Sequence, residues 1–450
     1  MLSDIHLDPF HDPARLAELR TAPVAAWAAI LNAPASSTQA SDFAHLQSTC
    51  GARGVDTPAA LLESSLAAAH AQQPHPLFVT VSGDLMAHLF DCRFHTLAPN
   101  TTAADLSSFA AKTVAFVALR LHQTFPHSPV YFALGNNDSS CHDYSEDPHS
   151  AYLLADAASF AADALTHANR AAILHQFPQL GDYAITLPAP IAHTRLIVLQ
   201  DIFESKRYAS CSGATSNDAA TAQISWLRAQ LSAARAAHRH VWLMAHIPPG
   251  IDAYYTFSKA RNICGGQSPE MFLRSEALAN TLADFPDVIR LVLLGHTHMD
   301  EFRIYKTATG AIPGKLVPSI TPINGNNPAF TLAEVDPSTA TLKDYAVYSA
   351  SNQTGISTQW SEEYRYSTTY HQPDFSGASL ALLTSSFLAD QSGKSAVSRA
   401  YQRFFYVGNP GLSSSLKSAA MRLVWPAYAC SLTSDRAASF RSCVCNTTTQ

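Results

Sequence analysis

Short apolar runs alternate with longer amphipathic segments along most of the chain. Five runs are rich in Val, Leu, Ile and Phe and too short for free-standing helices, so we predict buried strands at residues 77–81, 130–134, 196–199, 241–244 and 288–294. Between them, residues 103–125 and 219–236 carry apolar side chains at spacings of three and four, which predicts helices. Alternating strands and helices indicate an α/β layered fold, with β-sheets flanked by helices.

The pattern changes beyond the last of these runs. Residues 313–348 form short strand-like pieces separated by Asn, Gly and Pro, whereas residues 378–388, 396–405 and 415–423 have helical patterns. We therefore predict a large α/β domain over residues 1–350 and a small helical, cysteine-containing domain over residues 375–450.

Composition and charge exclude some classes of protein. The chain has 450 residues, of which 47% are hydrophobic and only 14% are charged. Its net charge is -6, and its Lys and Arg residues form no basic stripe. Nucleic acid is therefore disfavoured as the main partner, because binding to phosphate backbones requires clustered Lys and Arg. Since no stretch of 18 apolar residues occurs, we expect no transmembrane segment.

The cysteines bear on the compartment. Their even number favours disulfides in an oxidising environment, so we expect a secreted or periplasmic protein, although free buried thiols are the alternative and the sequence does not fix the pairing. The cysteines are Cys50, Cys92, Cys141, Cys211, Cys264, Cys430, Cys443 and Cys445. No export signal is visible, and only three residues precede Asp4, where a complete strand is normally expected. We expect that upstream sequence, including such a signal, is missing from this chain.

Metal-binding side chains follow the predicted strands. Seven such groups stand just beyond strand ends, and they are Asp4, His6, Asp84, Asn136, His246, His296 and His298. The carboxyl ends of strands in open α/β sheets are where ligands bind. Any one of the 20 histidines is more often an ordinary surface or core residue, but this placement is repeated at independent strand ends.

The chemistry of the seven groups suits two divalent cations. Carboxylate, amide oxygen and imidazole are ligands for hard-to-borderline metals, and two such metals can clamp a phosphoryl group. Asp4 and His6 are two residues apart, as are His296 and His298. In extended backbone each pair points to one side and can therefore grip one site.

The order of these motifs resembles that of the calcineurin-like metallophosphoesterases, and within them of the acid sphingomyelinase-like phosphodiesterases. The resemblance covers nearly the whole chain. It is carried by Ser3-Asp4-Ile5-His6-Leu7-Asp8, Gly83-Asp84 followed by His88, His246-Ile247-Pro248-Pro249-Gly250, and Gly295-His296-Thr297-His298-Met299-Asp300, together with the late cysteines. It implies a metallophosphoesterase sandwich with a small C-terminal helical domain.

The resemblance also implies a division of the ligands. Asp4, His6, Asp84 and His298 hold one metal, and Asp84 bridges to a second metal held by Asn136, His246 and His296. The implied metals are most often Zn²⁺, with Mn²⁺ or Fe in other branches. The implied reaction is in-line attack on phosphorus by a hydroxide that bridges the metals.

One position departs from the family pattern. Where the family usually has a His after the Asn ligand, this chain has Asn137, whose amide can donate a hydrogen bond but cannot deliver a proton. His88 matches a histidine proposed as proton donor in the sphingomyelinase-like group, so we expect His88 to be the general acid. A His88 that only lines the loop is the alternative.

The predicted function is hydrolysis of a phosphodiester, such as a sphingomyelin-like phospholipid or a nucleotide. We expect Tyr144, Tyr208 and Tyr254 at the rim to contact this small phosphoester or phospholipid head group, although each is also a natural packing residue. The alternatives are a polyphosphatase, a phosphomonoesterase, or a catalytically silent metal-binding protein. The sequence does not determine the oligomeric state.

Overall fold

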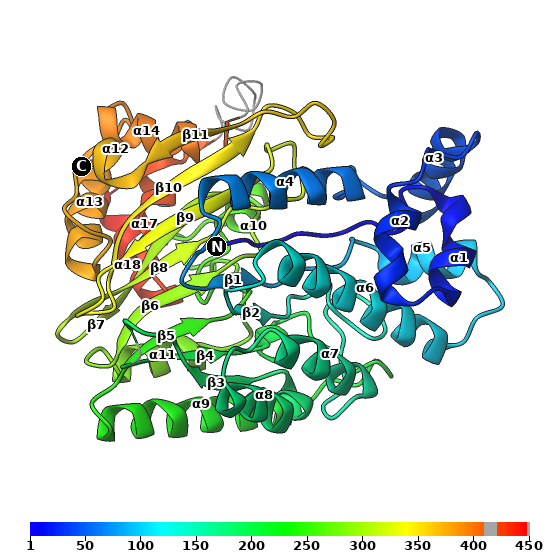
Figure 1. The fold of residues 1–450 in the computed structure, drawn as a ribbon. Coiled ribbons are helices and arrows are strands. Elements are labelled where there is room, and N and C mark those ends of the chain that lie inside the picture. The colour runs from blue at the N-terminus through cyan, green and yellow to red at the C-terminus, as the bar shows by residue number, and fades with distance from the viewer. Residues whose placement is uncertain (192, 409–420, 448–450) are drawn as a thin grey trace.

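Three β-sheets form the centre of the computed structural model, which describes residues 1–191, 193–408 and 421–447 (Figure 1). A six-stranded sheet has the order β3-β4-β5-β6-β8-β7, a three-stranded sheet has the order β11-β10-β9, and β1 pairs in parallel with β2. The strands are β1 (Val79–Ser82), β2 (Val130–Ala133), β3 (Tyr183–Thr186), β4 (Thr194–Val198), β5 (His240–Met244), β6 (Ile289–Leu294), β7 (Glu301–Thr307), β8 (Gly310–Leu316), β9 (Ala329–Val335), β10 (Leu342–Ala350) and β11 (Trp360–Arg365).

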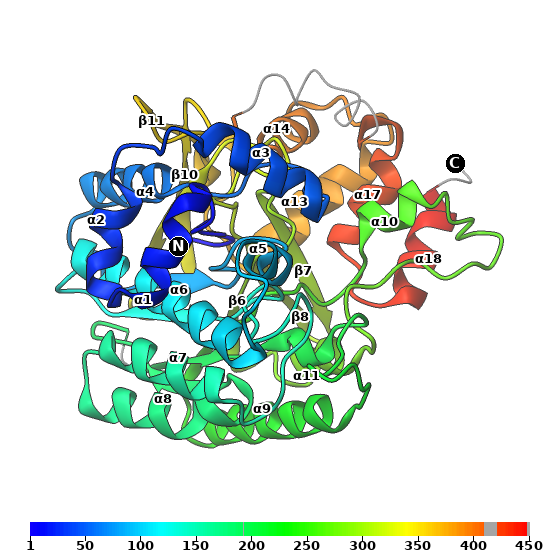
Figure 2. The ribbon, with the colours of Figure 1, turned by 90° about the vertical axis from the view of Figure 1, so that its right-hand side faces the viewer.

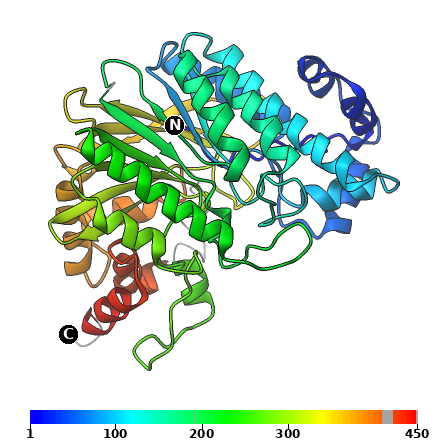
Figure 3. The same cartoon turned by 90° about the horizontal axis from the view of Figure 1, so that it is seen from below.

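The central strands are apolar because both of their faces are buried. In β5, Trp242 and Met244 belong to one hydrophobic cluster, whereas Val241 and Leu243 belong to a second cluster. Successive side chains of a strand point to opposite faces, so β5 separates two cores. The second core is closed by α9 (Asp218–Ala236) and α11 (Ala277–Asp284). Figure 3 shows α9 lying along the outer face of the sheet.

The first core lies between the sheets and under the N-terminal half of the chain. Its longest helix, α6 (Ala103–Thr124), begins with a capping box in which Thr102 and Asp105 bond to each other's backbone. The other helices of this region are α1 (Leu16–Thr21), α2 (Trp27–Leu31), α3 (Gln39–Cys50), α4 (Ala59–Gln72), α5 (Phe90–Leu97), α7 (Ala151–Ala162) and α8 (His167–Leu180). Helices α1–α3 and α5 gather at one end of the molecule (Figure 1).

The C-terminal helices pack on the other side. They are α12 (Tyr366–Tyr370), α13 (Gly377–Ala389), α14 (Ala396–Phe404), α17 (Trp425–Leu432) and α18 (Ala437–Thr447). Phe387, Tyr401 and Trp425 from these helices share the first core with Phe302 of β7. The C-terminal helices thus pack on the sheets through a shared core. The domain boundary predicted for residues 375–450 stays a prediction.

Four disulfides join all eight cysteines, and the alternative of free thiols is wrong. The pairs are Cys50–Cys92, Cys141–Cys211, Cys264–Cys445 and Cys430–Cys443. Cys264 follows α10 (Ala253–Ser258) and ties it to α18, which lies beside it in Figure 2.

The predicted elements were largely correct. All five predicted strands occur as β1, β2, β4, β5 and β6, and the two predicted helices occur as α6 and α9. The helices predicted at residues 378–388 and 396–405 are α13 and α14, whereas most of the one predicted at residues 415–423 lies outside the described residues. Strands β3, β7 and β11 were missed. None of the helices in the described ranges has the length and apolar character to cross a membrane.

Candidate metal centre

The seven predicted ligands lie where the strands of the sheets end. Asp84 follows β1, Asn136 follows β2, His246 follows β5, and His296 and His298 follow β6, whereas Asp4 and His6 come from the N-terminal segment. That segment lies beside β1 because Leu2 forms a parallel bridge with Val81. The fold therefore brings distant parts of the chain to one edge.

Left-handed backbone occurs at five of the seven positions. The φ angles are 47° at Asp4, 46° at His6, 55° at Asp84, 74° at His296 and 66° at His298. The prediction of extended backbone at the pairs Asp4/His6 and His296/His298 is therefore wrong. Cross-segment hydrogen bonds impose the bend: the Asp4 N–H donates to the Gly83 carbonyl (3.0 Å) and the His6 N–H to that of Asp84 (2.9 Å). Such residues cost about 1–3 kcal/mol each and concentrate at functional sites.

The first group of ligands is tightly packed and buried. Ligand atoms of Asp4, His6, Asp84 and His298 all lie within 4.8 Å of one another. His6 Nε2 is 3.3 Å from Asp84 Oδ2, and His298 Nε2 is 3.3 Å from Asp4 Oδ1. The two Nε2 atoms are themselves 3.3 Å apart. Four electron-pair donors aimed at one small space can hold a cation.

The second group joins the first through Asp84. His246 Nε2 lies 3.1 Å from Asp84 Oδ2, the same oxygen that faces His6. His296 Nδ1 lies 2.8 Å from Asn136 Oδ1. The Asn136 amide is turned this way because its Nδ2 donates to Asp143 Oδ1 at 2.7 Å. Asp84 Oδ2 thus lies within 3.3 Å of a ring nitrogen from each group. Asp4 reaches the second group less closely, because its carboxylate accepts the His296 N–H and its Oδ1 is 4.0 Å from His246 Nε2.

Backbone carbonyls fix the tautomers of two histidines. His6 Nδ1 lies 2.8 Å from the Met86 carbonyl, and His246 Nδ1 lies 2.8 Å from the Ser82 carbonyl. A carbonyl only accepts, so each Nδ1 carries the proton and each Nε2 presents a lone pair to Asp84. Metal-binding histidines are held in this way in proteins.

The buried charges fit a cation. Burial disfavours a charged His6, but the adjacent Asp84 carboxylate outweighs burial and raises the pKa of His6 to about 9. The pKa of His246 is likewise raised, against burial, to about 10 by Asp84 and Asp4. Within the described part of the chain, His246 Nε2 has no hydrogen-bond partner. A buried lone pair beside carboxylates that attract positive charge is what a divalent cation requires.

His88 lies against the first group. Its ring stacks on His6 with centroids 3.9 Å apart and an angle of 17°. Its Nδ1 is 2.8 Å from Asp56 Oδ1, and its backbone N–H donates to Asp56 Oδ2. Asp56 is buried and also accepts from Arg93, whose Nη1 donates to Asp8. This orients the half-exposed His88 ring, which has a nitrogen within 4.8 Å of ring nitrogens of His6 and His298.

Asn137 donates two hydrogen bonds to the Asp84 carboxylate. Its backbone N–H donates to Asp84 Oδ1 at 2.8 Å and its side-chain Nδ2 donates to Asp84 Oδ2 at 2.9 Å. The neighbouring Gly135 has no room for a side chain, because a Cβ there would collide with Asp84. The loop after β2 is therefore shaped around Asp84.

Three buried carboxylates were missed by sequence reasoning. Asp138 accepts the N–H groups of Leu85 and Met86 and so ties the β1 and β2 loops together. Asp201 accepts the N–H of Ile247 beside His246. Asp201 could have been found, because like the ligands it stands just beyond a predicted strand, residues 196–199. Nothing in the local sequence marks Asp56.

The three predicted rim tyrosines differ in position. Tyr144 is buried with its hydroxyl 3.4 Å from His296 Nε2, and the Arg207 guanidinium lies 3.9 Å over its ring. Tyr208 is buried and its hydroxyl donates to the Glu146 carbonyl. Tyr254 is 72% exposed on α10. Of the three, only Tyr144 touches a predicted ligand.

Comparison with known proteins gives a consistent result. A family model described as calcineurin-like phosphoesterase matches residues 2–300. The chain is 28% identical to mouse acid sphingomyelinase-like phosphodiesterase 3b over 84% of this chain and 77% of that protein. It is 25% identical to sphingomyelinase phosphodiesterase D of Dictyostelium discoideum over 71% of this chain and 67% of that protein.

Two further matches are weaker, the first in coverage and the second in identity and TM-score. The bovine cyclic GMP-AMP phosphodiesterase SMPDL3A is 27% identical over 41% of each chain. Among solved structures, a dimetal phosphatase from Danio rerio matches with a TM-score of 0.38 and 13% identity, over 68% of this chain and 90% of that chain.

Proposed function

The chain belongs to the calcineurin-like phosphoesterase family, and on this premise we propose that it hydrolyses a phosphodiester at a centre of two divalent cations. One observation carries the proposal: a single carboxylate oxygen, Asp84 Oδ2, lies 3.3 Å from His6 Nε2 and 3.1 Å from His246 Nε2. A carboxylate placed between two groups of ligands is suited to two cations rather than one.

We assign the ligands in two sets. Asp4, His6, Asp84 and His298 would hold one cation, and Asp84, Asn136, His246 and His296 would hold the other. Bound there, two divalent cations would neutralise charge on the phosphoryl group and lower the pKa of water. Imidazole, carboxylate and amide ligands without thiolate suit hard-to-borderline divalent metals. We propose Zn²⁺, the metal implied by the resemblance to the sphingomyelinase-like phosphodiesterases, with Mn²⁺ or Fe as alternatives.

His88 is the proposed general acid. Its Nδ1 faces Asp56 at 2.8 Å, so the Asp56 carboxylate orients the ring. The other nitrogen is then free to donate to a leaving-group oxygen. Such proton donation contributes about 10²–10⁴-fold in rate when the leaving group is poor.

Asn137 is assigned a different role. Both of its hydrogen bonds go to Asp84, and an amide does not release a proton at neutral pH. We propose that Asn137 fixes the orientation of Asp84, so that both of its oxygens are held before any substrate binds.

The proposed substrate is a phosphodiester of a lipid head group or of a nucleotide. The named relatives are sphingomyelinase-like and cyclic GMP-AMP phosphodiesterases. Tyr144, whose hydroxyl is 3.4 Å from His296 Nε2, and Arg207, which lies over the Tyr144 ring, would contact the group attached to phosphorus. Tyr208 would support the rim through Glu146, and exposed Tyr254 would contact a larger substrate.

We also propose that the protein works outside the cytoplasm. The support is the set of four disulfides, because disulfides persist in oxidising compartments and are rare where thiols are kept reduced.

The test begins with protein stripped by a chelator and reloaded with Zn²⁺ or Mn²⁺. We expect two metal equivalents per chain and hydrolysis of bis(p-nitrophenyl) phosphate faster than of p-nitrophenyl phosphate. A panel of sphingomyelin, dinucleotides and polyphosphate then identifies the substrate from the release of phosphocholine, nucleotide or shorter polyphosphate. Faster hydrolysis of the monoester would instead indicate a phosphomonoesterase, and two bound metals without turnover on any substrate would contradict the proposal.

A further inference from the structure

Three arginines stand at the amino ends of β4, β5 and β6, which are the strand ends remote from the metal centre. Arg195 is the second residue of β4, Arg239 directly precedes β5, and Arg290 is the second residue of β6. These strands are parallel neighbours in the six-stranded sheet, so the three positions share one edge (Figure 1). The five residues of β5, or ~17 Å of extended chain, separate Arg239 from the segment that carries His246.

None of the three forms an ion pair within the described part of the chain, whereas the arginines of the adjacent helix are paired. On α9, Arg228 Nη2 donates to Asp284 at 2.7 Å. Arg235 Nε donates to Asp287 at 2.8 Å, and Asp287 is the carboxylate whose charge also acts on Arg290. The three unpaired arginines are half-buried. A charge removed from water normally has a partner, so a partner from outside the chain is to be expected.

Arg195 and Arg239 meet at one side chain of β3. Thr186 and Arg195 are direct partners in the antiparallel pair of β3 and β4, so their side chains stand on the same face. Arg239 Nη1 donates to Thr186 Oγ1 at 3.2 Å. Arg195 Nη2 donates to Gln230 Oε1 of α9 at 2.8 Å. Both acceptors are neutral, and a guanidinium has five N–H donors, so most donors of the two groups remain available.

The two guanidinium groups repel each other. Burial lowers the pKa of Arg195, and the positive charge of Arg239 lowers it further. An anion placed between them would remove this repulsion. The Thr186 hydroxyl and the Gln230 amide, which accept from the arginines, each keep a proton to donate to such an anion.

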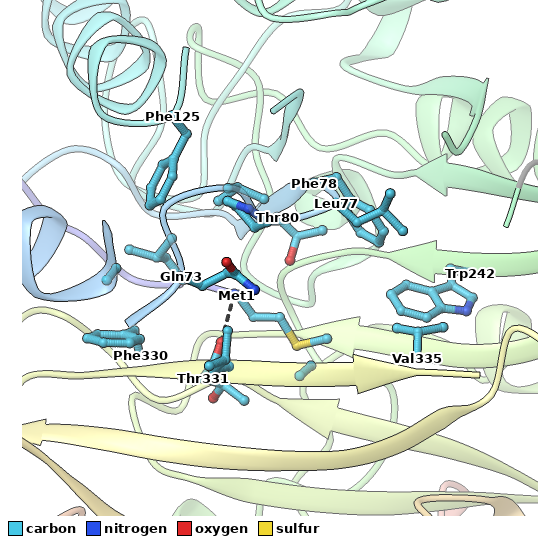
Figure 4. A pocket seen from close by; sticks show the side chains of 16 residues that line it. Met1, Gln73, Leu77, Phe78, Thr80, Phe125, Trp242, Phe330, Thr331 and Val335 are labelled. Atoms are coloured by element: carbon cyan, nitrogen blue, oxygen red, sulfur yellow. Dashed lines mark hydrogen bonds between the residues drawn. The ribbon is translucent and has the colours of Figure 1, made fainter. Parts of the chain in front are cut away.

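The opposite face of β5 is apolar at this end. Trp242 lines a groove of about 290 Å³ with Phe78 and Val335, and none of the side chains that line the groove is formally charged (Figure 4). Successive side chains of a strand point to opposite faces, so Arg239 lies on the side of Val241, which belongs to the core under α9. The two arginines therefore share the α9 face, and the groove lies on the other face.

We propose that Arg195 and Arg239 bind a tetrahedral oxyanion, a phosphate or sulfate group, at this edge of the sheet. The planar fork of a guanidinium matches two oxygens of such a group and binds them bidentately. Thr186 and Gln230 orient the two forks and add neutral donors, and Arg290 adds positive charge from the neighbouring strand. The group belongs either to a free anion or to a larger molecule such as a sulfated sugar.

Binding can be measured by titrating the metal-loaded protein with inorganic sulfate in a calorimeter at low ionic strength. We expect saturable binding that is at least tenfold weaker in Arg195→Gln and in Arg239→Gln. Arg239→Lys keeps the charge but loses the fork, so its loss should be intermediate. The matched control is Arg53→Gln, which removes an exposed arginine of the loop after α3 and should bind like the wild type.

The metal centre must be separated from this site because it also attracts oxyanions. Asp84→Asn disrupts the metal centre and should keep the sulfate binding that Arg239→Gln loses. Sulfate binding that is lost in Asp84→Asn and kept in Arg239→Gln would overturn the proposal without touching the proposed hydrolysis. Titration with inorganic phosphate and with a sulfated disaccharide identifies the source of the group from whichever binds more tightly.

Thermal unfolding guards against misfolded variants. Because Arg239→Gln removes one of two repelling charges, its Tm in anion-free buffer should equal or exceed that of the wild type. Sulfate stabilises proteins in general, and a bound anion adds to this effect. The rise in Tm with sulfate should therefore be larger in the wild type and in Arg53→Gln than in Arg239→Gln, and equal rises in all three would overturn the proposal.

Discussion

The two halves of the candidate metal centre are supported in different ways. The N-terminal half consists of Asp4, His6 and His298, and it is backed by buried ion pairs in which Arg93 contacts Asp8 and Asp56. The loop half consists of Asn136, His246 and His296. Its member Asn136 stands at the start of a loop that the disulfide Cys141–Cys211 ties to a second loop.

We infer from this difference that the N-terminal half is the more rigid of the two and the loop half the more adjustable. The backbone of Asp4 and His6 is held by hydrogen bonds to Gly83 and Asp84, and the charged groups behind it are buried in ion pairs. The geometry of the N-terminal half is therefore fixed by the core. The loop half carries Tyr144, whose ring lies under Arg207 at the rim. We infer that the N-terminal half serves the chemistry common to the family and that the loop half adapts the site to its substrate.

The largest effect should come from Asp84, which both halves share. Asp84→Asn is expected to reduce kcat/KM for bis(p-nitrophenyl) phosphate by about 10⁴-fold or more, because it removes a charge that acts jointly with the other ligands. Metal analysis should show fewer than two equivalents. The control is Asp42→Asn, an exposed residue of α3. Two tightly held metals with near-normal turnover would refute the shared role of Asp84.

The next effect tests the N-terminal half through His88. His88→Ala should slow hydrolysis of a diester with an alkoxide leaving group by about 10²–10⁴-fold, yet change p-nitrophenolate release little, since that group leaves without a proton. Asp56→Asn should show the same selectivity more weakly. An equal loss on both substrates would mean that His88 supports the metal ligands instead.

A smaller effect is expected in the loop half. Replacing Cys141 and Cys211 by Ser opens a loop of 70 residues and should lower the free energy of unfolding by about 4 kcal/mol. The matched control, replacing Cys430 and Cys443, opens a loop of 13 and should cost about 3 kcal/mol. Urea unfolding measures both. Only the first pair should raise KM, and a similar rise in the control would show that the loop half is not specially dependent on its tether.

The pH dependence of stability should distinguish the halves in metal-free protein. Burial raises the pKa of Asp201 in the loop half to about 7. The folded state then holds a proton between about pH 4 and 7 that the unfolded state has lost, so stability falls as pH rises through that window, by at most about 4 kcal/mol. Asp201→Asn should flatten this decline in urea titrations.

Asp56 in the N-terminal half should behave oppositely. Burial alone would raise its pKa, but His88, His6 and Arg93 outweigh burial and lower it. Its contribution is therefore complete above the unfolded pKa, near 4, and is lost as pH falls through the lower folded value. Asp56→Asn should remove part of the acid-side loss of stability, and an unchanged acid limb would contradict the assignment.

Strand ends were the part of the site that could be predicted from sequence. Asp84, His246 and His296 follow short apolar strands, and such strands are recognisable because both faces are buried. Asp56 could not be found in this way. It reaches His88 only because residues near it pair with the N-terminal segment through the Leu7–Thr57 bridge, which is a tertiary contact.

Strand β7 shows why some elements were missed. It contains Glu301 and Arg303, which suggest an exposed segment, yet both are buried. The Tyr428 hydroxyl donates to Glu301, and Arg303 donates to the Ile251 carbonyl. Partners from distant helices and loops make these charges acceptable inside, and no local pattern reveals such partners.

The disulfide Cys264–Cys445 spans 181 residues and encloses the last strands and all the C-terminal helices in one covalent ring. A protease that cuts once inside this ring does not release a fragment. The nicked chain would migrate as two pieces only after reduction, and it could retain its fold and its metals while appearing intact on a non-reducing gel.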